Sequence, residues 1–186
     1  EEIEYKEISI NIGKYQLSTS LPLSGGSSVF WRLADPKGKD IVRLWLNHLV
    51  ASVFFKSEPS LEFEYTKGIY RDHKNDGFKI LQFDYIADPS VELEKWLSYR
   101  EKGLISPLLI NAELGKKVFE KSLLKKEFTP GDFNKLWCDS FTERGLSYDP
   151  YIQWFWDEAP EWPGTLKATI EDLYSNLFNS LQAVEQ

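Results

Sequence analysis

The sequence predicts a mixed α/β (α+β) fold, in which a small mixed sheet comes first and several helices pack around it. Two observations carry this prediction. Between residues 3 and 33 apolar and polar side chains alternate in short segments separated by glycine turns, which is typical of antiparallel strands. From Asp40 onward, apolar residues recur mainly at helical spacing. Because the chain has 186 residues and is 42% hydrophobic, we expect a single domain over residues 1–186.

Three strands open the predicted sheet. Residues 3–12 alternate between apolar and polar side chains, and residues 15–21 and 28–33 form the next two strands. Gly25-Gly26 can adopt the positive φ angles that a tight hairpin needs. The first third of the chain therefore predicts a three-stranded antiparallel arrangement.

A long helix is predicted next, from about Asp40 to Phe55. Asp35-Pro36 ends the preceding strand, because proline has no N–H to donate to a ladder. One face of the helix has the i, i+3, i+4, i+7 spacing. The chain has two histidines and one cysteine, so we expect the histidine on this face to be a core or interface residue, not a zinc ligand. The predicted face consists of Ile41, Leu44, Trp45, His48, Leu49 and Ser52.

Two more strands are expected before the helical part of the chain. Residues 61–65 alternate between apolar and acidic, which predicts a strand with one solvated face. Asn75-Asp76-Gly77 is a turn signal, and residues 78–85 form another strand. Between them we expect a solvated basic loop, with phosphate contact as the less favoured interpretation. Its basic residues are Lys67, Arg71, His73 and Lys74.

The remaining chain is predicted to be helical. One helix opens at Asp88-Pro89-Ser90 and ends at Gly103 as a left-handed cap, and residues 106–110 form an extended exit. Cys138 falls in a helical pattern, which predicts a buried, inert thiol. The later helices are expected at residues 112–124, with a basic end at Lys121, Lys125 and Lys126, from Thr129 to about Glu143, after Asp149-Pro150, and at residues 166–184.

Composition limits the function. A net charge of −7 argues against an autonomous DNA-binding domain, so any nucleic-acid contact is expected to be local or shared with a partner. No apolar run is long enough for a membrane span and no signal peptide is evident, and the single cysteine fits a reducing compartment. We therefore expect a cytoplasmic protein. Since the chain opens on Glu1-Glu2 and contains no methionine, we expect a fragment or a processed chain.

The hairpin followed by a long helix is the layout of the restriction-endonuclease-like nuclease core. Such nucleases need an Asp at the end of one hairpin strand and an acid-x-Lys triplet in the next, to hold Mg²⁺ and the attacking water. Residues 17–23 offer Ser20 or Pro22 at the first position, and residues 30–36 offer Trp31-Arg32-Leu33 at the second. The sequence therefore predicts this core with its catalytic residues missing, and no metal or cofactor.

Two alternatives stay open. In an active Mg²⁺-dependent nuclease, Asp35, Asp40 and Asp84 would converge in space, or Glu4-Tyr5-Lys6 would supply the triplet. In a free-standing protein-binding module, the intact protein would be expected to end near the limits of this domain. For the domain of a larger subunit, residues 154–156, Trp-Phe-Trp, fit either a surface for protein contact or a core.

Several segments resemble the C-terminal domain of RecC, the gamma subunit of exodeoxyribonuclease V. They occur in the same order as in that family and cover nearly the whole chain. They are residues 13–17, residues 32–49 beginning Arg-Leu-Ala-Asp-Pro, residues 93–108 with their Gly-Leu-x-x-Pro-Leu exit, and Asp149-Pro150-Tyr151 before a final amphipathic helix.

The resemblance implies a domain with the nuclease fold of its RecB partner but without the catalytic residues. It implies membership of an ATP-dependent helicase–nuclease that processes double-strand breaks for recombinational repair, with RecB-like and RecD-like partner subunits and DNA reached through the assembled complex. The family's strand-guiding contacts match no motif here. The DNA-contact candidates are the basic residues around the missing active site, which are otherwise a solvated rim: Arg32, Lys37, Lys39 and Arg43.

Overall fold

The computed structural model describes residues 2–58, 62–138 and 145–184 of the chain. The chain forms two compact units, one of Glu1–Tyr99 with Asn179–Gln186 and one of Arg100–Phe178. The fold is mixed α/β, with a six-stranded mixed sheet and flanking helices, as predicted. That the two units act as one domain stays a prediction.

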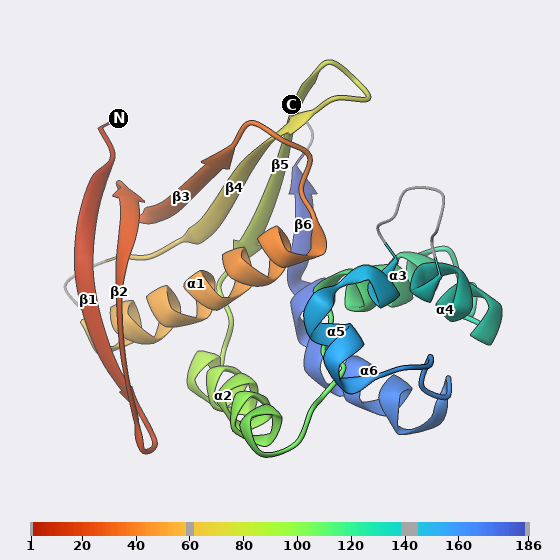
Figure 1. The fold of residues 1–186 in the computed structure, drawn as a ribbon. Coiled ribbons are helices and arrows are strands. Elements are labelled where there is room, and N and C mark those ends of the chain that lie inside the picture. The colour runs from red at the N-terminus through yellow and green to blue at the C-terminus, as the bar shows by residue number, and fades with distance from the viewer. Residues whose placement is uncertain (1, 59–61, 139–144, 185–186) are drawn as a thin grey trace. The chain divides into compact units, whose positions relative to one another are not determined.

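The sheet lies in the first unit, and its strands follow one another in chain order (Figure 1). Strands β3 and β4 pair in parallel, while every other neighbouring pair is antiparallel. The strands are β1 (Glu4–Ile12), β2 (Tyr15–Ser24), β3 (Ser27–Arg32), β4 (Tyr65–Asp72), β5 (Gly77–Asp84) and β6 (Leu181–Val184).

The three predicted opening strands are confirmed. Strands β1 and β2 pair along their whole length, from Glu4 opposite Leu23 to Ile12 opposite Tyr15. Gly25 has a φ of +58°, as the predicted hairpin turn requires. Strands β2 and β3 pair over only two residue pairs beside that turn, so β3 diverges from β2 and joins β4.

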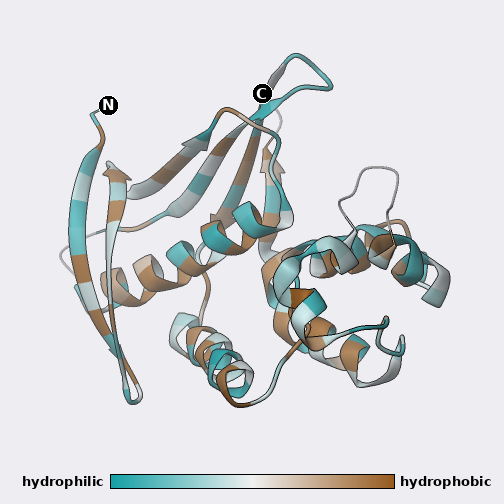
Figure 2. Cartoon of the chain, in the orientation of Figure 1, coloured by the Kyte–Doolittle hydropathy of each residue, from teal (hydrophilic) through white to brown (hydrophobic). Residues whose placement is uncertain are grey.

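Helix α1 (Gly38–Ser57) follows β3, and hydrophobic and polar segments alternate along it (Figure 2). All six residues of the predicted apolar face are buried. The Trp45 ring lies 4.9 Å from the Phe83 ring of β5, and His48 Nδ1 lies 3.1 Å from Thr66 Oγ1 of β4. These contacts hold α1 against the sheet and confirm His48 as a core residue.

The strand expected at residues 61–65 is wrong. Of these, residue 61 lies outside the described residues, 62–64 are not in a strand, and β4 begins at Tyr65. Lys67 and Arg71 are consequently strand residues, and the predicted basic loop is reduced to the turn that contains His73 and Lys74. Buried and less buried residues alternate along β4, as in other strands. A pattern of apolar residues does not reveal this alternation, because the buried residues are Thr66, Gly68 and Tyr70, which are small or carry a hydroxyl group.

Helix α2 (Pro89–Ile105) confirms the predicted start but not the predicted end. Gly103 lies inside the helix, and its φ is not among the positive values, so it is not a left-handed cap. The Ser106 N–H donates to the Lys102 carbonyl at 2.9 Å, which carries the helical bonding past the glycine. Gly103 weakens the helix without ending it.

The second unit contains the helices between α2 and β6. Three of them begin after side-chain caps, with Asn111, Thr129 and Asp149 each accepting backbone N–H bonds, and the helix starts predicted at Thr129 and after Asp149 are confirmed. Buried Leu114, Phe133 and Tyr174 contribute to the core of this unit. The elements are α3 (Ala112–Leu123), α4 (Pro130–Trp137), η1 (Leu146–Tyr148), α5 (Pro150–Phe155) and α6 (Gly164–Ser180).

Two further predictions are wrong. Helix α4 ends at Trp137, before the predicted Glu143, which itself lies outside the described residues; Cys138 is the C-terminal cap and is exposed, not buried. The last helix ends at Ser180, and residues 181–184 form β6, pairing with β5. The helical period of Leu166–Val184 did not show this, because the open edge of β5 provides hydrogen-bond partners that only the folded chain brings near.

Candidate functional site

The two windows tested for nuclease chemistry lie on neighbouring strands of the first unit. Ser20 and Pro22 lie on β2, and Trp31 and Arg32 lie at the end of β3. A pocket of about 280 Å³ opens where β3 ends and α1 begins. We call it the arginine pocket. Its lining consists of Phe30, Trp31, Arg32, Asp40, Arg43, Leu44 and Tyr70.

Asp40 is the only carboxylate among the described residues that line the arginine pocket. Its Oδ2 accepts a hydrogen bond from Arg32 Nη1, with which it forms an ion pair, and another from the Lys37 N–H at 2.9 Å. Asp40 is the third residue of α1, so the second bond also satisfies a backbone donor at the helix start. The carboxylate is therefore engaged by two donors.

Tyr70 forms the buried wall of the arginine pocket, with 4% of its surface exposed. Burial raises the pKa of Tyr70 to about 12, and the Asp40 charge adds to the rise, while Arg32 and Arg43 oppose it. The phenol therefore stays protonated near neutral pH and remains a hydrogen-bond donor.

The structure brings two of the four DNA-contact candidates into one pocket. Arg32 comes from β3 and Arg43 from α1, and both line the arginine pocket. Lys37 and Lys39 lie at the start of α1 and are exposed, but they do not line it. The Lys37 backbone N–H nevertheless donates a hydrogen bond to Asp40, which lines the pocket. Whether any of the four contacts DNA stays a prediction.

The carboxylates proposed for an active nuclease do not converge. Asp84 lies at the end of β5 opposite Tyr65, and Asp40 bonds to Arg32, which lies opposite Tyr70 at the other end of β4. Five residues of strand separate these positions by roughly 16 Å. Asp35 accepts the His73 N–H at 3.1 Å. In the part of the chain that the structure describes, no cluster of three or more metal-ligating side chains is present.

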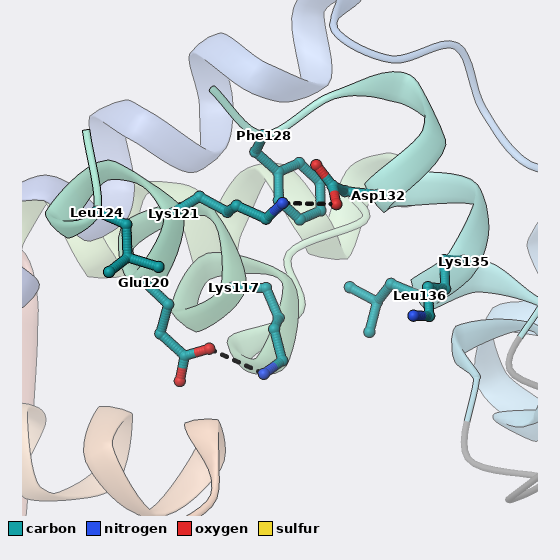
Figure 3. Close-up of a pocket in the computed structure, with 8 residues that line it drawn as sticks. All are labelled: Lys117, Glu120, Lys121, Leu124, Phe128, Asp132, Lys135 and Leu136. Carbon is teal, nitrogen blue, oxygen red and sulfur yellow. Dashed lines mark hydrogen bonds and ion pairs between the residues drawn. The ribbon is translucent and has the colours of Figure 1, made fainter. Parts of the chain in front are cut away.

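A second basic pocket, which the sequence reasoning missed, lies in the second unit between α3 and α4 (Figure 3). Its volume is about 410 Å³, and we call it the lysine pocket. The basic end predicted for the helix at residues 112–124 was the available signal, because Lys121 of that end lines the pocket. The charged lining residues are Lys117, Glu120, Lys121, Asp132 and Lys135, and the apolar ones are Leu124, Phe128 and Leu136.

The aromatic run of residues 154–156 is largely exposed. Trp154 has 83% and Phe155 59% of its surface accessible. Phe155 and Trp156 line a further pocket of about 300 Å³ together with residues 107–111. Of the two interpretations that the sequence left open, the accessible surface is the one that the structure favours for Trp154 and Phe155.

The fold and the arginine pocket define a mixed α/β domain with a basic pocket, lined by one engaged carboxylate, at the end of a sheet strand. Comparison with protein families makes the assignment specific: the model of the RecC C-terminal domain matches residues 1–123, and the chain belongs to that family. The match ends with α3 and does not include the Asp149-Pro150-Tyr151 segment. A search of curated proteins found no match.

Family membership implies a role in the RecBCD exodeoxyribonuclease V complex, which is a multi-subunit assembly. Among the described residues, no helix combines the length and the apolar character that a bilayer span requires.

Proposed function

We propose that this chain is a non-catalytic, nuclease-like domain of the gamma subunit, which contacts partner subunits and DNA during recombinational repair of double-strand breaks. The observation that carries the proposal is the state of Asp40. This carboxylate lies where the hairpin meets α1, yet it bonds Arg32 and the start of α1. In this interpretation a restriction-endonuclease-like core has kept its hairpin and helix and replaced metal-binding side chains with a cation-bearing pocket.

Coordination chemistry supports the loss of catalysis. Mg²⁺ in nucleases is held by carboxylates together with substrate oxygens. The arginine pocket offers one carboxylate, whose Oδ2 already accepts two hydrogen bonds, and Arg32 and Arg43 place positive charge around it. A metal ion at this position would be repelled by both guanidinium groups.

The same charges suit a phosphate diester. Arginine donates two parallel hydrogen bonds to phosphate oxygens, and Tyr70 adds a hydroxyl donor. Lys37 and Lys39, exposed at the start of α1, extend the positive region in front of a helix N-terminus. Because the chain has a net charge of −7, this contact is proposed to be local, with affinity supplied mainly by the assembled complex.

The partner contacts are proposed to involve RecB-like and RecD-like subunits. Exposed Trp154 and Phe155 supply large apolar surfaces of the kind enriched at the centres of interfaces. Interface burial of such residues contributes more per residue than the burial of most others.

The first experiment separates the proposal from an active nuclease. Purified chain is incubated with labelled linear DNA and Mg²⁺, beside the Asp35→Ala and Asp84→Ala variants. We expect no cleavage by any of the three. Cleavage by the wild-type chain that either substitution abolishes would overturn the proposal.

The second experiment tests the DNA contact in the assembled complex of the full-length protein. Replacing Arg32 and Arg43 with Ala removes two phosphate contacts, and the slope of log affinity against log salt is expected to fall by about 1.8. The loss should not depend on DNA sequence. Arg71→Ala is the matched control, because Arg71 also lies on the sheet but pairs with Asp76. An unchanged slope in the double variant would refute the contact.

A further inference from the structure

The lysine pocket is positively charged although the chain is acidic. Its lining carries three lysines, at positions 117, 121 and 135, against the two carboxylates of Glu120 and Asp132, in a chain of net charge −7. Figure 3 shows Lys121 and Asp132 joining α3 to α4 along one edge, with Lys117 and Glu120 along the opposite edge. Leu124, Phe128 and Leu136 supply its apolar surface. The pocket thus combines apolar and basic side chains in one lining.

Two of its three lysines are held in ion pairs. Lys117 Nζ lies 2.8 Å from Glu120 Oε2, and this hydrogen bond raises the pKa of Lys117. Lys121 Nζ lies 2.8 Å from Asp132 Oδ1 and holds the pKa of Asp132 at about 2, with help from hydrogen bonds of Thr129. The two pairs therefore favour the charged forms of Lys117 and Asp132. Lys135 makes no ion pair within the described residues and is available to a ligand carboxylate.

The surroundings of the pocket favour a protein ligand. Leu123 and Leu124 at the end of α3 have 82% and 66% of their surfaces exposed. Adjacent exposed leucines followed by Lys125-Lys126 form an apolar and basic rim, which is complementary to an acidic segment that carries a large apolar side chain.

The same chemistry argues against nucleic acid at this site. Lys117 and Lys121 already pair with Glu120 and Asp132, so the described lining offers one further lysine and not the row of cations along which a phosphate backbone binds. Lysine is the only basic residue type among the described lining residues, so the bidentate phosphate contacts of arginine are missing. Phe128 is 6% exposed and its ring packs edge-on against Trp162 at 5.1 Å, which leaves no free face for a base to stack on.

We propose that the lysine pocket docks an acidic segment of a partner subunit, with one large apolar side chain against Leu124 and Leu136 and a neighbouring carboxylate on Lys135. The chemistry of the ligand follows from the pocket, and its assignment to a partner subunit rests on the proposed function. The site is separate from the arginine pocket, since its lining residues all belong to the second unit.

The test is site-specific photocrosslinking in the complex assembled from the full-length protein. A photoreactive amino acid replaces Leu124, and a second preparation carries it at exposed Val91 as a position control. Complex formation is measured first by size-exclusion chromatography, and crosslinked peptides are then identified by mass spectrometry. We expect the Leu124 probe to crosslink to a segment of a partner subunit in which acidic residues flank a large apolar residue.

Charge reversal provides the second readout. Lys135→Glu is expected to lower the crosslinking yield at position 124 by about tenfold, because it opposes the ligand carboxylate. The matched control is Lys74→Glu, which makes the same charge change in a turn of the first unit and should alter the yield by less than about twofold. Lys135 is exposed, so folding is expected to be unaffected, and circular dichroism checks this.

The outcomes separate this inference from the proposed function. If the wild-type complex fails to assemble, the proposed function and the partner assignment both fall. If it assembles but the Leu124 probe crosslinks to DNA, to a basic segment, or no more than the Val91 probe does, the docking proposal alone is refuted. Equal yields from Lys135→Glu and wild type would refute it as well.

Discussion

The arginine pocket and the lysine pocket are built on the same local device but differ in the chemistry around it. In each, an aspartate at the third position of a helix accepts the backbone N–H before the helix and also pairs with a cation from another element. Asp40 does so for α1 with Arg32, and Asp132 for α4 with Lys121. In both pockets an aspartate that caps a helix also holds a side-chain cation from another element in place.

The differences lie in burial and in the neighbouring side chains. The arginine pocket is closed by buried Tyr70 and carries planar guanidinium groups, which suit the paired anionic oxygens of a phosphate diester. The lysine pocket has single point charges around exposed Leu124, which suits an apolar side chain beside a carboxylate. Four predictions test this contrast, in order of decreasing effect on free energy.

The largest expected effect is a loss of stability at low pH in the first unit that the second unit does not share. Burial lowers the pKa of His48 to about 4 from an ordinary value of 6.5, partly opposed by Asp84. Below pH 6.5 the unfolded state therefore binds more protons, so stability is complete above that pH and falls until pH 4, by about 3 kcal/mol. The depressed pKa of Asp132 affects the second unit only below its ordinary value of 3.8.

Hydrogen exchange measured at several pH values checks this prediction. Peptides of α1 and β4 should lose protection between pH 6.5 and 4, while those of α3 and α4 keep theirs. His48→Gln is the control, because it removes the titrating group and should leave a flatter profile in the first unit. Equal loss of protection in both units would contradict the predicted difference in their pH dependence.

The second prediction concerns the core packing of the second unit, at residues that do not line the lysine pocket. A Cβ at Gly115 would lie 2.8 Å from Cγ of buried Tyr174, so Gly115→Ala is expected to destabilise the second unit by about 2 kcal/mol. Gly103→Ala is the matched control: it also lies in a helix, but nothing is within 4 Å of the new atom. That variant should gain up to about 1 kcal/mol. Urea unfolding measures both, and a neutral Gly115→Ala would refute the packing argument.

The third prediction concerns the two helix starts. Helix α4 has a complete capping box, in which Thr129 Oγ1 accepts the Asp132 N–H at 3.2 Å, whereas Lys37 gives α1 no side-chain acceptor. Thr129→Ala should cost about 1 kcal/mol, and Lys37→Thr should add about 0.5 kcal/mol. Thermal unfolding measures both changes. If Lys37 also contacts phosphate, Lys37→Thr should raise stability while weakening DNA binding, a split that a purely structural role does not produce.

The smallest expected effect comes from exchanging the two types of basic side chain, at Arg32 and at Lys121. Arg32→Lys retains the charge beside Asp40 but loses the guanidinium fork, so DNA affinity of the assembled complex should fall by about threefold. Lys121→Arg, the reciprocal change, should leave DNA affinity unaltered and preserve the pair with Asp132. Fluorescence anisotropy at fixed salt compares them. If Lys121→Arg lowered DNA affinity more than Arg32→Lys did, the lysine pocket and not the arginine pocket would be assigned the DNA contact.

Much of this molecule was predictable because its signals are local. The apolar face of α1 and the helix starts at Thr129 and after Asp149 depend on residues within one or two turns, and the structure confirms them. The hairpin at Gly25 is equally local. The exposure of Cys138 was missed because the sequence shows a helical period but not the residue at which the helix ends.

Local patterns were enough to predict the mixed α/β class, the opening hairpin and the long helix, and they show no acid at the tested positions of the two hairpin strands. Two features depend on folding: residues 181–184 leave a helical pattern to pair with β5, and Lys121 meets Asp132 across a loop. The physical reason is the distance along the chain over which each interaction acts. Periods and caps are satisfied by near neighbours, whereas an open strand edge or a charge partner acts only after folding has brought distant segments together.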